Sequence, residues 1–322
     1  MGTRPPKPID GASTSEPRRS GLVRHPWRAF LLVLALHGAG FSLVSLVLYR
    51  VLGLPQDLSN IEAVPTAAHF TVAGLLGYVL MPYLLRLPSG SRSFGKYLDD
   101  IRLTRVKPFL PLLLLTVSCD LILILCQGTG SLAFRLTEGQ FLTWEFVRRV
   151  FDLSSALPPQ STLLFAVFFS SFEEVVFRGI FLTMLLEKHP SRRAIVYSAI
   201  AFGVLHLPAV LAGHALIHAL GLVVWASLFG LFYGYLFIKS GSLLPRMIIH
   251  WLSHVFQAPL TAYWQSAPGA VDALYGVVFG HGLATFLLLL WVRFLCPRWL
   301  TPGARQLTAP PGRSQTGRES LP

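Results

Sequence analysis

The sequence predicts an all-α protein that crosses a membrane several times. Of its 322 residues, 53% are hydrophobic and only 13% are charged, whereas about 25% of the residues of a soluble domain are charged. The mean hydropathy is +0.57, and long apolar runs recur along most of the chain. Because a helix of about 20 apolar residues crosses a bilayer core, these runs predict about eight transmembrane helices.

The order of polar and apolar stretches predicts the elements. Residues 1–26 are rich in Pro, Ser, Gly and Arg and lack apolar periodicity, which predicts a disordered tail, and residues 302–322 predict a second one. Residues 27–298 form the predicted bundle, with spans at 27–51, 66–86, 108–127, 161–186, 194–212, 216–238, 243–263 and 273–295. The linkers at about 94–101 and 141–151 are amphipathic, which suits helices in the interface plane or helices packed on the bundle.

Positive charge alternates between the connections of these spans. The formal net charge is +12. Lys and Arg gather in both tails and in the even-numbered connections, for example Arg102 in the second and Lys239 and Arg246 in the sixth. The positive-inside rule therefore predicts that both termini are cytoplasmic. Basic runs with interleaved aromatic residues are absent from the sequence, so we expect the lipid bilayer and no nucleic acid as a partner.

The most unusual stretch is Glu173-Glu174-Val175-Val176-Phe177-Arg178, in the middle of the fourth predicted span. Ionisable groups at this depth cost roughly 2.5–3.5 kcal/mol each to insert, so they usually face a bundle interior and have a function. Glu174 and Arg178 are four residues apart, which predicts an ion pair on one helix face. Glu173 points about 100° away, which leaves its carboxylate for chemistry such as general-base catalysis.

Three histidines lie in other predicted spans. His206 is in the fifth span, and taken alone it favours a hydrogen-bonded packing role. His250 and His254, in the seventh span, are four residues apart and share one face, which suits metal ligation or a pair of hydrogen-bond donors. Purely structural roles are the alternative. Two glutamates and three histidines at membrane depth favour a buried polar site between the fourth, fifth and seventh helices.

Taken in order, the motifs Glu173–Arg178, Phe202–His206 and His250–His254 resemble those of the CPBP family of intramembrane proteases. This family is also called the ABI or type II CAAX prenyl endopeptidase (Rce1-like) family, and the resemblance covers about residues 160–258, the expected catalytic core. It implies an eight-helix endopeptidase in which Glu173 activates the hydrolytic water with help from His206. It also implies that His250 and His254 stabilise the oxyanion, with Glu174 and Arg178 in support.

The chain departs from the family pattern at His254, where the family commonly has Asn. A neutral imidazole can still donate one hydrogen bond to an oxyanion, so the role can survive. Histidine also adds a metal ligand, and with Glu173, His206 and His250 it would complete a zinc set. Both a metalloprotease and a metal-free glutamate mechanism are argued for the family, so metal dependence stays open.

The resemblance implies hydrolysis of a peptide bond in a membrane-embedded or lipid-modified protein or peptide, such as a prenylated CAAX-type substrate. The expected location is the plasma membrane of a bacterium, or the endoplasmic reticulum of a eukaryote. One alternative is a catalytically inactive family member that acts as a membrane scaffold or an immunity-type protein, which the histidine at position 254 favours. A proton-relaying transporter ranks last, because the sequence lacks paired broken helices.

Overall fold

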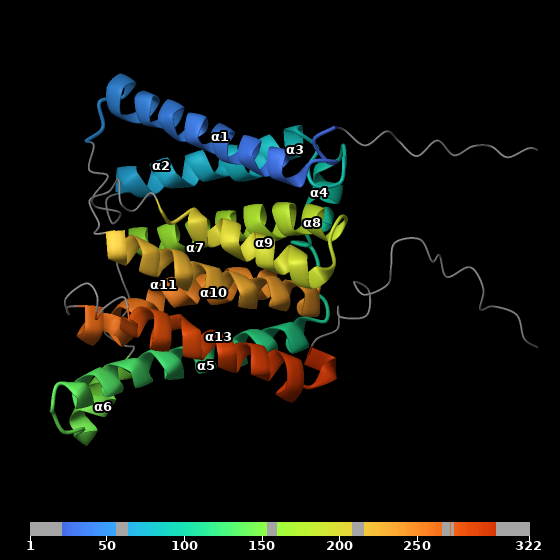
Figure 1. Ribbon diagram of the computed structural model, residues 1–322. Coiled ribbons are helices and arrows are strands. Elements are labelled where there is room, and N and C mark those ends of the chain that lie inside the picture. Colours follow the sequence, from blue (N-terminus) through green and yellow to red (C-terminus); the bar gives the residue numbers. More distant parts are fainter. Residues whose placement is uncertain are drawn as a thin grey trace, which may run out of the picture.

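The computed structural model describes residues 21–55, 64–152, 160–207, 216–265, 271 and 274–300. These residues are mostly helical and contain no strand, which confirms the all-α prediction. The long helices lie side by side in one bundle, and the described chain begins and ends at the same end of it (Figure 1). The predicted tails lie outside the described residues except near residue 26, where residues 21–24 form a turn that buries Val23.

In the described residues the bundle has eight longer helices, several of which continue into π-helical segments. The longer helices are α1 (Pro26–Ser45), α2 (Val64–Gly74), α5 (Phe109–Thr137), α7 (Gln160–Glu174), α9 (Ser191–Val204), α10 (Leu216–Ser240), α11 (Leu244–Gln265) and α13 (Leu283–Leu290). The π-helical segments are η1 (Leu46–Val51), η2 (Leu75–Leu80), η4 (Val175–Leu182), η6 (Gly276–Gly282) and η7 (Trp291–Leu295). Short helices complete the described fold: α3 (Met81–Leu84), α4 (Phe94–Asp100), α6 (Trp144–Val150), α8 (Thr183–Leu186) and the 3-10 turn η8 (Arg298–Leu300).

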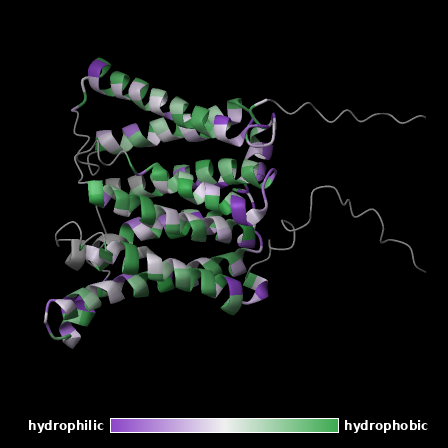
Figure 2. Cartoon of the chain, viewed as in Figure 1, coloured by the Kyte–Doolittle hydropathy of each residue, from purple (hydrophilic) through white to green (hydrophobic). Residues whose placement is uncertain are grey.

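Within the described part of the chain, five helical runs are long and apolar enough to cross a membrane, judged by length and composition: Pro26–Val51, Val64–Leu84, Phe109–Thr137, Leu216–Ser240 and Gly276–Leu295. Hydrophobic residues extend along the helices, and hydrophilic residues gather at the ends of the bundle (Figure 2). The three other predicted spans, 161–186, 194–212 and 243–263, contain the charged and histidine residues of the predicted site. A total of eight spans therefore stays a prediction.

Both amphipathic linkers contain a short helix. Ser93 begins α4 by accepting a hydrogen bond from the Lys96 amide, at 3.1 Å, and Thr143 begins α6 in the same way. Such side-chain caps satisfy backbone amides that have no partner in the first helical turn. The apolar face of α4 buries Tyr97, whereas Trp144 on α6 is 79% exposed. Tyr97 therefore packs into the bundle, and the Trp144 side of α6 faces outward.

The helices that would carry the site pack at the centre of the bundle, with α7 against α11 and α9 against α10 (Figure 1). Small residues allow α9 and α10 to approach closely, as is common between membrane helices. A Cβ atom on Gly203 would lie 2.0 Å from Oγ of Ser227, and one on Gly230 would lie 2.8 Å from Cα of Ala199. This contact fixes the end of α9 that is followed by His206.

Candidate functional site

The two adjacent glutamates end α7, and the π-helical segment η4 begins at the next residue. Every residue of η4 is buried, and π-helical turns inside α-helices occur frequently at functional sites. Nη1 of Arg178 donates a hydrogen bond to Oε1 of Glu174 at 2.9 Å, and both side chains are completely buried. The ion pair expected from their spacing is therefore present.

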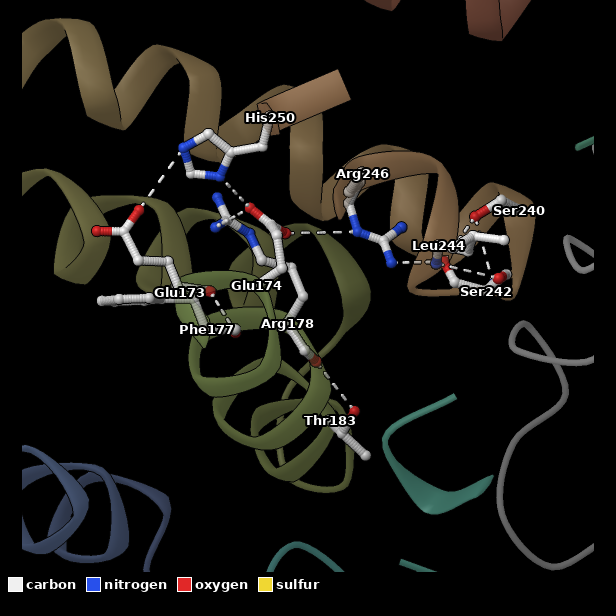
Figure 3. Close-up of polar contacts among 11 residues, drawn as sticks. Glu173, Glu174, Phe177, Arg178, Thr183, Ser240, Ser242, Leu244, Arg246 and His250 are labelled. Carbon is white, nitrogen blue, oxygen red and sulfur yellow. Dashed lines mark hydrogen bonds and ion pairs between the residues drawn. The ribbon is translucent and has the colours of Figure 1, made fainter. Parts of the chain in front are cut away.

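Arg246 is a second cation on Glu174 that we did not predict from the sequence. Its Nε lies 3.6 Å from Oε2 of Glu174, its side chain is completely buried, and its guanidinium also donates to the carbonyl oxygen of Ser242 (Figure 3). We had counted Arg246 among the basic loop residues that indicate topology, which was wrong, because it lies in the first turn of α11. The sequence does contain a signal for it: Arg246 precedes His250 by four residues and so shares its helix face.

Arg102, another charge that we placed in a loop, is also buried, with 7% of its surface exposed. Its Cζ lies 4.5 Å from the ring centroid of Phe237, and Cζ of Arg246 lies 4.6 Å from the same centroid. Desolvation by burial, with a contribution from nearby Arg105, lowers the pKa of Arg102 to about 10. This value is still far above neutral pH, so Arg102 is charged, and the Phe237 ring lies within cation–π range of two cations.

His250 on α11 lies between the two glutamates (Figure 3). Its Nδ1 is 3.1 Å from Oε1 of Glu174, and its Nε2 is 3.6 Å from Oε2 of Glu173. An ionised carboxylate only accepts hydrogen bonds, so Nδ1 carries a proton and donates it toward Glu174. In neutral His250, Nε2 then has a lone pair that faces Glu173. Glu174 therefore orients His250 in addition to pairing with Arg178.

A cavity of about 50 Å³ adjoins these groups, and its polar lining consists of Glu173, His206, His250, Ser253 and His254. Four of these are the predicted site residues, so α7, α11 and the turn after α9 supply polar groups to one space. The apolar lining consists of Phe169, Phe202, Trp225, Ala226 and Phe229. Because one water needs about 10–15 Å³ of such volume, the cavity has room for a few water molecules.

The other two histidines of the cavity differ in their surroundings. Nδ1 of His206 is 2.9 Å from the carbonyl oxygen of Phe202. A carbonyl only accepts, so Nδ1 is the protonated nitrogen and Nε2 has the lone pair when the ring is neutral. The ring of His254 stacks on that of His250, with 5.0 Å between centroids and 23° between planes. His254 is exposed where it lines the cavity.

The predicted zinc ligands are close to one another but do not form a ready metal centre. Zinc requires three or four nitrogen, sulfur or oxygen ligands at about 2.0–2.3 Å. Glu173 and His250 are close enough to share an ion. In the described part of the chain, however, no three His, Cys, Asp or Glu side chains are gathered so that they could hold one. Metal dependence therefore stays open, and no chemical step below depends on zinc.

Three comparisons with known proteins gave one match. A search of curated proteins and a search of solved structures found no match. A protein-family model does match, over residues 156–256, and that stretch contains all the residues that surround Glu174 and line the cavity. Its description is type II CAAX prenyl endopeptidase Rce1-like. Residues 156–256 of this membrane protein therefore match the Rce1-like family of type II CAAX prenyl endopeptidases.

Proposed function

We propose that this protein is an intramembrane endopeptidase that hydrolyses a peptide bond of a membrane-associated substrate. One observation carries the proposal: the carboxylate of Glu173 lies beside Nε2 of His250 at a small cavity that His206 and His254 also line. Peptide hydrolysis requires an activated water and hydrogen-bond donors at the developing oxyanion. Groups able to supply both functions line this one space.

Glu173 is the proposed general base. A water in the cavity would give a proton to the Glu173 carboxylate as its oxygen attacks the carbonyl carbon of the substrate. His206 can assist, because the hydrogen bond from its Nδ1 to Phe202 leaves the lone pair of Nε2 as an acceptor for the same water. The proton on Glu173 then passes to the leaving amine, and the free carboxyl and amino termini are formed.

His250 and His254 are the proposed oxyanion donors. Glu174 holds the Nδ1 proton of His250, so Nε2 can donate to the oxyanion only when His250 is protonated. His254 can donate one ring N–H while neutral. Glu174 thus has an orienting role toward His250, which Arg178 and Arg246 support by fixing its carboxylate.

The family description favours a prenylated CAAX-type substrate, whose lipid would keep the scissile bond near the membrane. The alternation of basic residues supports a topology with both termini in the cytoplasm. A substrate whose C-terminus lies in the cytoplasm could then reach the site from the cytoplasmic side of the membrane. We expect the protein in a bacterial plasma membrane, or in the endoplasmic reticulum of a eukaryote.

The test compares the termini of all cellular proteins between cells that express the wild type, Glu173→Gln or Glu138→Gln. Glu138 follows α5, is exposed and does not line the cavity, so it is the matched control for the loss of one carboxylate. We expect Glu173→Gln to abolish a defined set of cleaved termini while it accumulates in the membrane like the wild type. Retained cleavage in Glu173→Gln would refute the mechanism, and identical termini with and without the wild-type protein would favour an inactive scaffold.

A further inference from the structure

A second pocket opens at the end of the bundle where the described chain begins. Its volume is about 300 Å³, and it is lined by His25, Pro26, Trp27, Arg28, Lys188 and His189. It shares no lining residue with the cavity at Glu173. Four of its six lining residues carry basic groups, and none of the six is acidic. Glu187, next to Lys188 in the chain, is not among the lining residues. The pocket is therefore suited to an anion.

Packing joins the two walls of this pocket, although they are far apart in the sequence. Nζ of Lys188 donates a hydrogen bond to the carbonyl oxygen of Arg24, which connects the turn after α8 to the segment before α1. The ring of Trp27 meets that of Phe181 edge to face, with 4.8 Å between centroids. These contacts hold the first turn of α1 beside Lys188. The positive groups of the pocket thus converge on one space.

The backbone adds positive potential at the same place. Helix α1 begins at Pro26, and no side chain caps its first turn. Amides at an uncapped helix N-terminus have no intrahelical acceptor and, together with the helix dipole, favour phosphate and other anions. Arg28 lies in this first turn, and Lys188 is in the opposite wall. A phosphate in the pocket would therefore face a guanidinium, an ammonium and helix amides together.

The position of the pocket decides what carries the phosphate. It opens at the first residues of a run that is long and apolar enough to span a bilayer, Pro26–Val51. Trp27 stands at the start of this run, half exposed, as aromatic residues do at headgroup level. One turn further, Leu31 is 61% exposed and offers an apolar path for an acyl chain. A free phosphate would make no use of that path, whereas a lipid would.

We propose that this pocket binds the phosphate headgroup of an anionic phospholipid. Arg28 and Lys188 pair with the phosphate, and the first turn of α1 adds hydrogen bonds from the amides of Trp27 and Arg28, since Pro26 has no N–H. The acyl chains continue along the exposed apolar side of α1. A zwitterionic lipid binds more weakly, because its own cation competes with Arg28 and Lys188 for the phosphate. Basic pockets between membrane helices are a known mode of headgroup recognition.

The test measures lipid binding to the full-length protein in a neutral detergent by native mass spectrometry. The probes are phosphatidylglycerol, phosphatidylcholine and inorganic phosphate, each added in a separate titration. The test variant is the double substitution Arg28→Gln with Lys188→Gln. The control is Arg192→Gln with Arg193→Gln, which removes two exposed charges from the first turn of α9 but does not change the pocket lining. Monodispersity and thermal unfolding show that each variant is folded.

We expect phosphatidylglycerol to bind the wild type more tightly than either other probe. The pocket variant should lose about 30-fold in affinity for this lipid, since each basic residue near anionic lipid contributes about fivefold, and the control variant should lose less than about threefold. Equal losses of lipid affinity in the two variants would overturn the proposal, because they would indicate a general electrostatic attraction between the basic surface and the anionic lipid. Phosphatidylcholine or inorganic phosphate binding as tightly as phosphatidylglycerol would also overturn it. None of these readouts depends on proteolysis.

Discussion

Nε of Arg246 lies 3.6 Å from Oε2 of Glu174, and both side chains are completely buried. This contact makes Glu174 the centre of a charge cluster from two helices, because Arg178 and His250 contact its other oxygen. The cluster connects α11 to the junction of α7 and η4. The carboxylate that we expected only to pair with Arg178 therefore also joins two helices and orients a proposed catalytic histidine.

Replacing Arg246 should destabilise the fold strongly. Arg246→Met keeps most of the side-chain volume but leaves Glu174 with one guanidinium fewer. Breaking a buried ion pair by removing one partner costs about 3–5 kcal/mol. Titration with a denaturing detergent measures the change in the free energy of unfolding. A double substitution with Glu174→Gln should cost less than the sum of the single changes, because the two residues interact, and strict additivity would contradict the coupling.

The adjacent glutamates should respond differently to the same substitution. Glu174→Gln leaves Arg178 and Arg246 without their buried carboxylate and should cost about 3–5 kcal/mol of stability. Glu173→Gln should change stability by less than about 1 kcal/mol, because its contact with His250, at 3.6 Å, is longer than a hydrogen bond. Its activity should fall about 10²–10⁴-fold, the usual contribution of a general base. Unfolding and cleavage assays on the purified variants measure both effects, and equal destabilisation by the two substitutions would contradict the division of roles.

His254 should be replaceable by another hydrogen-bond donor. His254→Asn offers a side-chain N–H to the oxyanion and should retain activity within about tenfold, whereas His254→Ala removes the donor and should lose about 10²–10³-fold in kcat. His254 is exposed at the cavity, so both variants should unfold like the wild type. Steady-state cleavage of a substrate identified from the cellular termini is the measurement. Full activity of His254→Ala would remove this residue from the mechanism.

The close contact of α9 and α10 should be sensitive to a single methyl group. In Gly203→Ala, the added Cβ would lie 2.0 Å from Oγ of Ser227 and 2.5 Å from the carbonyl oxygen of Val223. The helices must separate, at a cost of about 1–3 kcal/mol, and activity should fall because His206 moves away from the cavity. Gly38→Ala is the control, because its Cβ would meet nothing within 4 Å. We expect that control to match or slightly exceed wild-type stability in the same detergent titration.

A chelator should leave the activity unchanged. Glu173 and His206 can activate water without a metal, and no group of three ligands is gathered among the described residues. Purified protein is treated with a zinc chelator, the chelator is removed, and cleavage is measured before and after zinc is added back. Loss of activity that zinc alone restores would contradict the metal-free mechanism. It would identify Glu173, His206, His250 and His254 as the ligands to test next.

Several of these features could be predicted from the sequence, because they depend on spacing along one helix. The ion pair of Glu174 with Arg178 is such a case, and so is the shared face of His250 and His254. The contact between Arg246 and Glu174 depends on how α11 lies against α7, which one sequence does not reveal. The charge of Arg246 misled us because a basic residue near a predicted membrane edge suggests a loop. The number of spans is equally hard to predict, since the polar residues of the site lower the apolar character of the helices that carry them.

The size of the cavity at Glu173 has a consequence for inhibition. At about 50 Å³, it is several times smaller than the roughly 300–1,000 Å³ of pockets that hold drug-sized molecules. A compound that mimics the tetrahedral intermediate can reach Glu173 only after the surrounding aromatic side chains move apart. Such a compound should show slow-onset inhibition. The rate of onset should depend on how fast the aromatic side chains move apart and not on the concentration of the compound.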